Sequence, residues 1–244
     1  MLAESSVWLM SLAATPPGFR RHLAQAVGLW ARGRRQAKAW VPHISQARGI
    51  IDTSIDEMAS RRSVVVLGSG ALFEVPLESL ARTFETVHLV DRAHLWTIRG
   101  RTRRYTNTTL HWQDLSGANA SDPLAFVREI ADVDWVISSN LVSQLASAAA
   151  DGKERAEIDA HLAALASLPC RATLITDLNY RIVDNAGEVT EESDLLYGRE
   201  LPEPDASWKW EVAPFGEEAP DTRRVHRVAA WLDWRQAADG APAG

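Results

Sequence analysis

The sequence has a single cysteine, no long hydrophobic run and a long stretch without acidic residues. The lone Cys170 excludes an internal disulfide framework and favours a reducing compartment. Its place beside Pro169, where a strand is expected to begin, favours a packed side chain over a nucleophile. Apolar runs fall short of the roughly 20 residues that cross a bilayer. Residues 7–14 are apolar but lack a preceding basic segment, so we expect a cytoplasmic protein without a signal peptide or membrane partner.

Charge is distributed unevenly along the chain. No acid occurs between Ser5 and Ile51, whereas residues 182–222 hold twelve acids and two basic residues. The basic residues of the first stretch are Arg20, Arg21, Arg32, Arg34, Arg35, Lys38 and Arg48. Such a face could attract an anionic substrate, RNA or an acidic protein. We favour the simpler interpretation, a solvated face that lies against the acidic part of the same chain.

Hydrophobic periodicity predicts a helical N-terminal region followed by alternating strands and helices. Helices are expected over 5–14 and 19–40, and Pro42 is expected to interrupt before a further helix through Ile44 and Met58. Parallel strands are expected at 63–67, 86–90, 109–112, 134–138 and 172–176. We divide the chain into a helical extension or cap (1–60), a sheet domain (61–236) and a flexible tail (237–244).

The last part of the sheet domain departs from this alternation. Residues 181–190 are typical of a small hairpin around Asn185-Ala186-Gly187. Two further strands are expected at 208–212 and 224–232. The connection between these two is too short and too rich in proline to hold a crossover helix, so the strands should pair antiparallel.

A glycine turn follows the first strand and carries the chemistry of the chain. The strand Val64–Leu67 runs into Gly68-Ser69-Gly70, and the second strand ends on Asp91. Glycines at such a turn let the backbone approach a ligand, and the acid can accept hydrogen bonds from ribose hydroxyls. The pattern predicts a site for a nucleoside-containing cofactor.

Together these features resemble the Rossmann-like S-adenosylmethionine-dependent methyltransferases over about residues 60–235. The resemblance implies an α/β fold with a doubly wound, mostly parallel seven-stranded sheet, a C-terminal antiparallel hairpin and an N-terminal helical extension. It implies S-adenosylmethionine as the cofactor. Its binding residues would be Gly68, Ser69 and Gly70 at the methionine part, Asp91 at the ribose, Asp114 and Leu115 at the adenine, and Asn140 after the fourth strand. Gln144 and Tyr180 are candidates for contact with the methyl acceptor.

Two positions depart from the family pattern. Val66 stands where the family usually has an acid, and Leu72 stands where it usually has a further glycine. A nicotinamide site is disfavoured by Phe73, because that motif needs a small residue there. The residues alone leave two further roles open: Asp114 as the cap of the following turn, and Asn140 as a helix cap.

No catalytic residue is predicted. The histidines His43, His88, His111, His161 and His226 share no spacing, and no cluster has the spacing of metal ligands. We expect methyl transfer to a small-molecule acceptor, because no aromatic–basic platform for RNA is visible. The alternatives are a non-catalytic methyltransferase-like binding protein and a methyltransferase that acts on RNA or protein.

Overall fold

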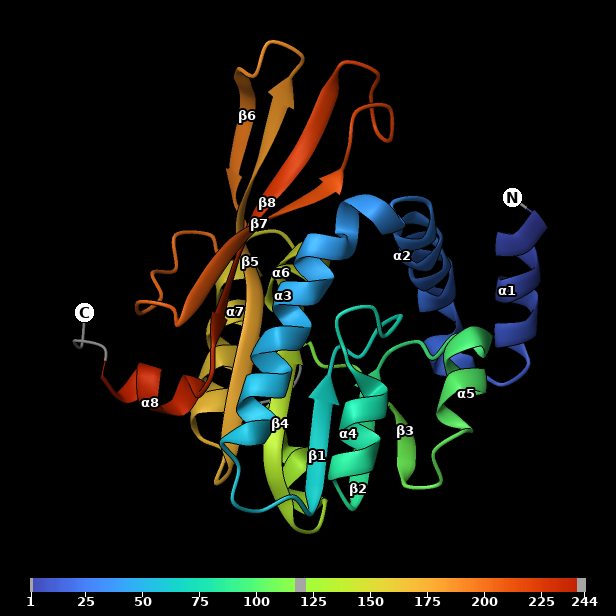
Figure 1. The fold of residues 1–244 in the computed structure, drawn as a ribbon, viewed down its shortest axis with the longest axis vertical. Helices are drawn as coiled ribbons and strands as arrows, with labels where there is room; N and C mark the ends of the chain where they lie inside the picture. Colours follow the sequence, from blue (N-terminus) through green and yellow to red (C-terminus); the bar gives the residue numbers. More distant parts are fainter. Residues whose placement is uncertain (1, 117–121, 241–244) are drawn as a thin grey trace.

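The computed structural model describes residues 2–116 and 122–240, which form one mixed sheet with helices on both faces (Figure 1). The strands are β1 (Ser63–Leu67), β2 (Thr86–Asp91), β3 (Thr108–Trp112), β4 (Val133–Ser139), β5 (Arg171–Asp184), β6 (Val189–Asp194), β7 (Ala206–Ala213) and β8 (Thr222–Trp231). The α-helices are α1 (Leu2–Leu12), α2 (Leu23–Arg35), α3 (Ala37–Asp56), α4 (Leu77–Thr83), α5 (Trp96–Thr102), α6 (Val142–Ala148), α7 (Glu154–Ala166) and α8 (Trp234–Asp239). Two short 3₁₀ helices are η1 (Pro17–His22) and η2 (Ala125–Glu129).

Seven strands lie side by side in the order β3-β2-β1-β4-β5-β8-β7. β1 to β5 pair in parallel, whereas β8 is antiparallel to both β5 and β7. The predicted parallel sheet with a closing antiparallel hairpin is therefore confirmed. All five residues of β1 are buried, because helices cover both faces of the sheet, and this burial explains the continuous apolar run.

Strand β5 is longer than its sequence pattern predicted. It continues past the expected end at 176, through a register shift near Asp177, and its outer half pairs with β6. The small hairpin predicted around residue 185 is present, but its first strand is the continuation of β5. In Figure 1 this extension rises beyond the helical layers together with the outer end of β8.

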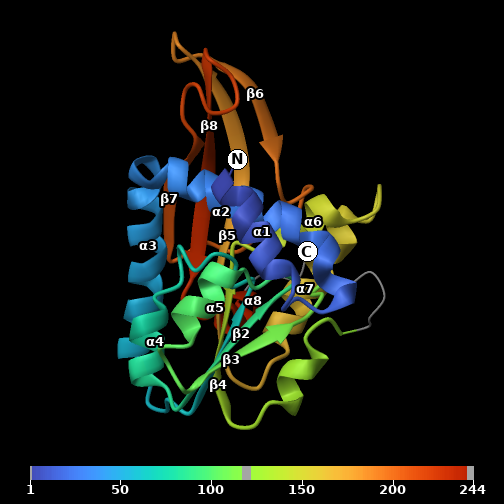
Figure 2. The ribbon, with the colours of Figure 1, turned by 90° about the vertical axis from the view of Figure 1, so that its right-hand side faces the viewer.

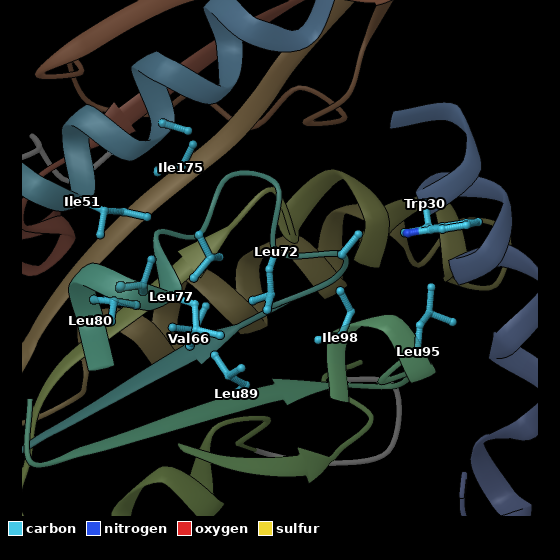
Figure 3. Packing of buried hydrophobic residues seen from close by; sticks show 14 of the residues in the cluster. Trp30, Ile51, Val66, Leu72, Leu77, Leu80, Leu89, Leu95, Ile98 and Ile175 are labelled. Carbon is cyan, nitrogen blue, oxygen red and sulfur yellow. The ribbon is translucent and has the colours of Figure 1, made fainter. Parts of the chain in front are cut away.

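Two hydrophobic clusters fill the two sides of the sheet. One joins α3, α4 and β1 through Ile51, Leu80 and Val66 (Figure 3). The other contains Leu162 of α7 and Trp234 of α8. Figure 2 shows α3 and α4 on one side of the sheet and α6 and α7 on the other. Helix α3 is therefore one of the helices that cover the sheet, and its buried residues share a core with β1.

The N-terminal helices break at a different residue from the one predicted. The expected helix over 19–40 ends at Arg35, and α3 begins after Gln36 and runs through Pro42 without interruption. A proline inside a helix removes one backbone hydrogen bond. Burial of Trp40 and Ile51 on the same helix offsets that loss, so tertiary packing overrides the local signal.

The C-terminal helix α8 extends beyond the predicted end of the sheet domain. The Asp233 side chain accepts a hydrogen bond from the Arg235 N–H and caps the helix, and Trp234 is buried. Residues 237–239, which we expected in a flexible tail, are therefore helical. The rest of the predicted tail, residues 241–244, lies outside the described residues.

Gly33 of α2 allows the loop after β1 to pack against the N-terminal helices. A Cβ at Gly33 would lie 2.3 Å from the Phe73 ring and 2.9 Å from the Trp40 ring. We expect Gly33→Ala to lower the free energy of unfolding by roughly 1–3 kcal/mol through overpacking. A Cβ at Gly28 on the same helix would have no neighbour within 4 Å, so Gly28→Ala should stabilise by about 0.5–1 kcal/mol. Urea unfolding measures both, and equal changes in the two variants would contradict this packing argument.

Candidate active site at the carboxyl edge of the sheet

The turn after β1 has the conformation that its glycines permit. Gly68 and Gly70 have φ of +71° and +49°, in the left-handed region. The Gly68 and Ser69 N–H groups donate to the Val90 carbonyl of β2 at 3.0 and 3.2 Å. A Cβ at Gly68 would lie 3.1 Å from the Ser139 carbonyl oxygen, so the turn also abuts the end of β4. Backbone from three neighbouring strands therefore meets at this turn.

Asp91 lies at the tip of β2, beside the glycine turn. Its carboxylate accepts hydrogen bonds from the Gly70 N–H at 2.8 Å and from the Ala93 N–H at 3.0 Å. The side chain stays at the carboxyl edge of the parallel strands, where such folds bind ligands. Asp91 thus orders the glycine turn as well as presenting a carboxylate at the edge.

The two departures from the family pattern have different structural effects. Val66 is fully buried within β1 and places no carboxylate at the edge. Leu72 keeps the left-handed backbone that a glycine would adopt easily, with φ of +56°. Such a conformation costs a non-glycine residue roughly 1–3 kcal/mol. Its side chain is fully buried in the core, and this burial offsets the strain.

The residues expected to contact the adenine, Asp114 and Leu115, lie near the 3₁₀ helix η1. Asp114 accepts a hydrogen bond from the Ser116 N–H at 3.2 Å, as a turn cap would, and lies 3.8 Å from an Arg21 nitrogen of η1. Leu115 is buried. Burial and then the charges of Arg92 and Arg21 lower the pKa of His22, against opposing effects of Asp114 and Asp91. No sequence signal pointed to η1 as a neighbour of these two acids.

Asn140 follows β4 with φ of +47° and is only 6% exposed. Its N–H donates to the Ile175 carbonyl at 2.9 Å, and its own carbonyl accepts from the Gln144 side chain at 2.7 Å. The cap position of α6 is Leu141, without a side-chain hydrogen bond, so Asn140 is not the helix cap considered from the sequence. Its side-chain amide instead lies 3.3 Å from Nε2 of His43.

Tyr180 lies on the outer half of β5, and its hydroxyl donates to Glu191 at 2.5 Å. That hydrogen bond raises the pKa of Tyr180, so the phenol keeps its proton and does not serve as a base. The Arg224 guanidinium lies 4.6 Å from the centre of the Tyr180 ring. Tyr180 thus forms part of a wall that continues towards His226, with 5.7 Å between the two ring centroids.

His226 of β8 and Asp177 of β5 form a buried pair that the sequence did not predict. His226 Nδ1 lies 3.2 Å from Asp177 Oδ2, and the two side chains are 13% and 8% exposed. The Ser143 hydroxyl donates to the same carboxylate oxygen at 3.3 Å. Both ring nitrogens of His226 are buried without a hydrogen bond, so the contact with Asp177 is a close approach of the two groups and not a hydrogen bond. The two strands come together only when the sheet forms, which is why no spacing signal revealed the pair.

Three of the other histidines form hydrogen bonds away from the residues that follow β1 and β4. His88 and His111 hydrogen-bond to each other between β2 and β3 at 2.9 Å, and burial lowers the pKa of both. His161 is bonded to Ser138, and burial lowers its pKa to about 4. His43 contacts Asn140, which follows β4, and His226 contacts Asp177 within β5.

Several buried polar atoms have no partner within the chain. In the part that the structure describes, they include Ser69 Oγ, Asn140 Oδ1, Asp177 Oδ1, Trp210 Nε1 and His226 Nε2. Buried polar groups are nearly always hydrogen-bonded in native proteins. Ser69 follows β1 and Asn140 follows β4, so these two atoms fit a site at the edge that a polar ligand completes, whereas the other three atoms lie within β5, β7 and β8.

Of two surface cavities, the smaller has His226 and Trp208 among its lining residues. The larger, about 530 Å³, is lined by α3, α4 and α5, with Arg48 and Arg101 among its residues. These two arginines donate to the Phe73 and Ala71 carbonyls of the loop after β1. The smaller, about 320 Å³, lies on β5, β7 and β8. We place the site by its hydrogen-bonding groups, because neither cavity is lined by the glycine turn or by Asp91.

The basic N-terminal face meets the acidic part of the same chain, as the favoured interpretation predicted. Arg35 pairs with Glu217 at 2.7 Å, and Arg32 pairs with Glu218 at 3.1 Å. Gln36 also donates to Glu217, at 2.6 Å. Part of the positive charge of α2 is therefore neutralised by the connection between β7 and β8.

The strand order and the glycine turn form the fold expected of a Rossmann-like S-adenosylmethionine-dependent methyltransferase. No family model matches the sequence, and no curated protein matches it. Among solved structures, the chain is similar to the N-methyltransferase NodS of Bradyrhizobium japonicum WM9 in complex with S-adenosyl-L-homocysteine. That match has 14% identity and a TM-score of 0.39, over 76% of this chain and 85% of that one.

Two further structures show the range of the matches. The DhpI–SAM–HEP complex matches at 14% identity and a TM-score of 0.43, over 87% of this chain and 99% of that one. The 23S rRNA methyltransferase ErmE matches at 12% identity and a TM-score of 0.37, over 76% and 67%. The fold assignment rests on the chain's own strand order, since the identities and TM-scores of these matches are low.

The described residues contain no group of histidine, cysteine, aspartate or glutamate side chains arranged to hold a metal ion. Within residues 2–116 and 122–240, every helix is too short or too polar to cross a bilayer.

Cys170 is placed for packing, as its sequence context suggested. Burial raises the pKa of its thiol to about 11, although Arg235 acts in the opposite direction. The thiolate is the reactive form of cysteine. We therefore expect the folded chain to resist a chromogenic disulfide reagent at neutral pH, and the chain in denaturant to react fully. Rapid labelling of the folded chain would contradict this assignment.

Proposed function

We propose that this chain is an S-adenosylmethionine-dependent methyltransferase that acts on a small-molecule acceptor. The observation that carries the proposal is the contact between Asp91 and the glycine turn. A carboxylate at the tip of β2 lies 2.8 Å from the Gly70 nitrogen of a left-handed turn after β1. This pairing supports a ribose-binding role for Asp91, because the acid lies beside a backbone that a ligand can approach closely.

The residues at the edge fit the parts of this cofactor. Gly68, Ser69 and Gly70 would lie along its methionine part, and the unpartnered Ser69 hydroxyl supplies a hydrogen-bonding group there. Asp91 would hold the ribose hydroxyls. Asp114 and the buried Leu115 would contact the adenine, with η1 above them.

The chain's own contribution to transfer would be alignment and proton removal. S-Adenosylmethionine supplies an electrophilic methyl group when bound, and a reaction of this type depends mainly on placing the acceptor in line. His226 is the candidate general base, because the Asp177 carboxylate 3.2 Å away can stabilise its protonated form. Gln144 and Tyr180 remain candidates for acceptor contact.

A small acceptor is favoured over RNA by the character of the surroundings. His226 lies between Tyr180 and Trp210, at ring-centroid distances of 5.7 and 5.8 Å, within an aromatic wall. The basic face of α2 is engaged by Glu217 and is thus less available to a polyanion. Aromatic side chains with a few polar groups among them are typical of small-molecule sites.

Calorimetric titration with S-adenosylmethionine and S-adenosylhomocysteine tests the cofactor assignment. We expect both to bind to the full chain. A screen of small acceptors with methyl-labelled cofactor then tests transfer. Absence of binding would overturn the proposal.

A non-catalytic, methyltransferase-like binding protein is the second candidate. The buried Val66 favours it, because that position gives no carboxylate for the cofactor's ammonium group. Binding of S-adenosylhomocysteine without transfer to any acceptor class, RNA and protein included, would support this candidate.

A further inference from the structure

His43 of α3 connects the N-terminal helices to the end of β4. It is 1% exposed, and its ring stacks on Trp210 with centroids 4.0 Å apart and planes 8° apart. Its two ring nitrogens contact side chains from three other segments, namely Trp208, Glu74 and Asn140. The position of His43 is therefore fixed by packing, and its hydrogen bonds define which ring nitrogen carries the hydrogen of the neutral ring.

The Trp208 contact determines which ring nitrogen carries the proton. The Trp208 indole nitrogen lies 3.0 Å from His43 Nδ1. An indole N–H only donates, so Nδ1 must accept and cannot carry a hydrogen. The proton of the neutral ring therefore lies on Nε2, which is 3.3 Å from a Glu74 carboxylate oxygen.

That proton in turn fixes the orientation of the Asn140 amide. Asn140 Nδ2 is placed 3.3 Å from His43 Nε2, while Asn140 Oδ1 is buried without a partner. Two donors cannot bond to each other, and the two ends of an amide have nearly the same shape. Exchanging the amide oxygen and nitrogen lets Oδ1 accept from His43 Nε2, whose single hydrogen it then shares with Glu74. The exchange turns the NH₂ group to the position of the unpartnered atom.

We propose that His43 is a positioning residue that holds the Asn140 NH₂ group towards the carboxylate of the cofactor's methionine part. This inference rests on the proposed function. The residues on either side of Asn140 border Gly68 of the turn that would face the methionine part, Ser139 through its carbonyl oxygen and Leu141 through its side chain. That part of the cofactor carries an ammonium, which only donates, and a carboxylate, which only accepts. An amide NH₂ can therefore pair only with the carboxylate.

The proton position is measured first, on the full chain without ligand. In ¹⁵N spectra of histidine-labelled protein, with the His43 signals assigned by their absence from a His43 variant, we expect a hydrogen on Nε2 and none on Nδ1. Trp208→Phe removes the indole donor and should weaken this preference. A hydrogen on Nδ1 of the wild-type chain would overturn the inference without any ligand.

Calorimetry with two probes then separates positioning from general damage. S-Adenosylhomocysteine contains the carboxylate, whereas 5′-methylthioadenosine lacks the whole amino-acid part. We expect His43→Phe and Asn140→Asp to weaken S-adenosylhomocysteine binding roughly tenfold or more, as for a lost charge-assisted hydrogen bond. Affinity for methylthioadenosine should stay within about twofold, because this probe lacks the carboxylate and so loses no hydrogen bond in these variants. His43→Gln, which retains an N–H donor, should recover much of the affinity.

The contrary results are distinct. Equal weakening of both probes, or unchanged binding in His43→Phe, would overturn the positioning role. Tight binding of S-adenosylhomocysteine by Asn140→Asp would show that an oxygen, and not the NH₂ group, faces the ligand. Failure of the wild-type chain to bind either probe would overturn the proposed function instead, and the proton position on His43 would still report on its hydrogen bonds.

Discussion

His226→Gln should lower the rate of methyl transfer by about 10²- to 10⁴-fold, the usual contribution of a general base. Glutamine keeps a polar side chain of similar length but cannot take up the acceptor's proton. His226 is not among the residues expected to hold the cofactor, so calorimetric affinity for S-adenosylhomocysteine should remain unchanged. The measurement is the rate of methyl transfer to the acceptor found by labelled-cofactor screening.

A second substitution and a matched control distinguish a base from a packing residue. Asp177→Asn should also slow transfer, because an amide does not stabilise the protonated imidazole. His111→Gln is the matched control for the base, since His111 is bonded to His88 between β2 and β3 and not to a residue of β5 or β8. A near wild-type rate in His226→Gln would show that the acceptor needs no base from this pair.

Asp91→Ala should weaken cofactor binding by at least tenfold. Hydrogen bonds to a charged group contribute roughly 1.5–3 kcal/mol each, and each 1.4 kcal/mol is a factor of ten in affinity. The substitution removes the expected ribose contact and also the acceptor of the Gly70 and Ala93 N–H groups. Because both contain the ribose, S-adenosylhomocysteine and 5′-methylthioadenosine should lose affinity alike.

A carboxylate at the opposite end of the sheet provides the control for Asp91. Asp134 begins β4, and its hydrogen bonds with Arg62 lower the pKa of its carboxyl to about 2. Asp134→Asn removes a comparable charge far from the glycine turn. It should leave cofactor affinity unchanged while thermal stability falls. Unchanged affinity in a folded Asp91→Ala variant would remove the ribose assignment.

Local patterns predicted the parts of the site that are local in sequence. The bounds of β1, the glycine turn and the place of Asp91 follow from one buried strand, one turn and the next strand. Such short-range features depend mainly on residue type and backbone freedom. Sequence alone therefore indicated the cofactor half of the candidate site.

The parts that the sequence did not reveal depend on contacts between distant segments. His43 meets Trp208 across 165 residues, and His226 meets Asp177 across a register shift in β5. A histidine on a helix face looks the same in sequence whether it fills a core or orients a ligand group. The extension of β5 was missed for a related reason: its outer half is stabilised by pairing with β6 and β8.

The hydrogen bond from the Trp40 indole to the Val212 carbonyl has a consequence for how the chain is made. At 3.1 Å it ties α3 to β7 across 172 residues of sequence, so β7 is synthesised well after α3. Glu217, the partner of Arg35 in α2, emerges later still. Contacts of such long sequence separation form slowly. Helices α2 and α3 thus leave the ribosome well before the segments that complete their packing, and their apolar faces stay uncovered in the nascent chain until those segments are made.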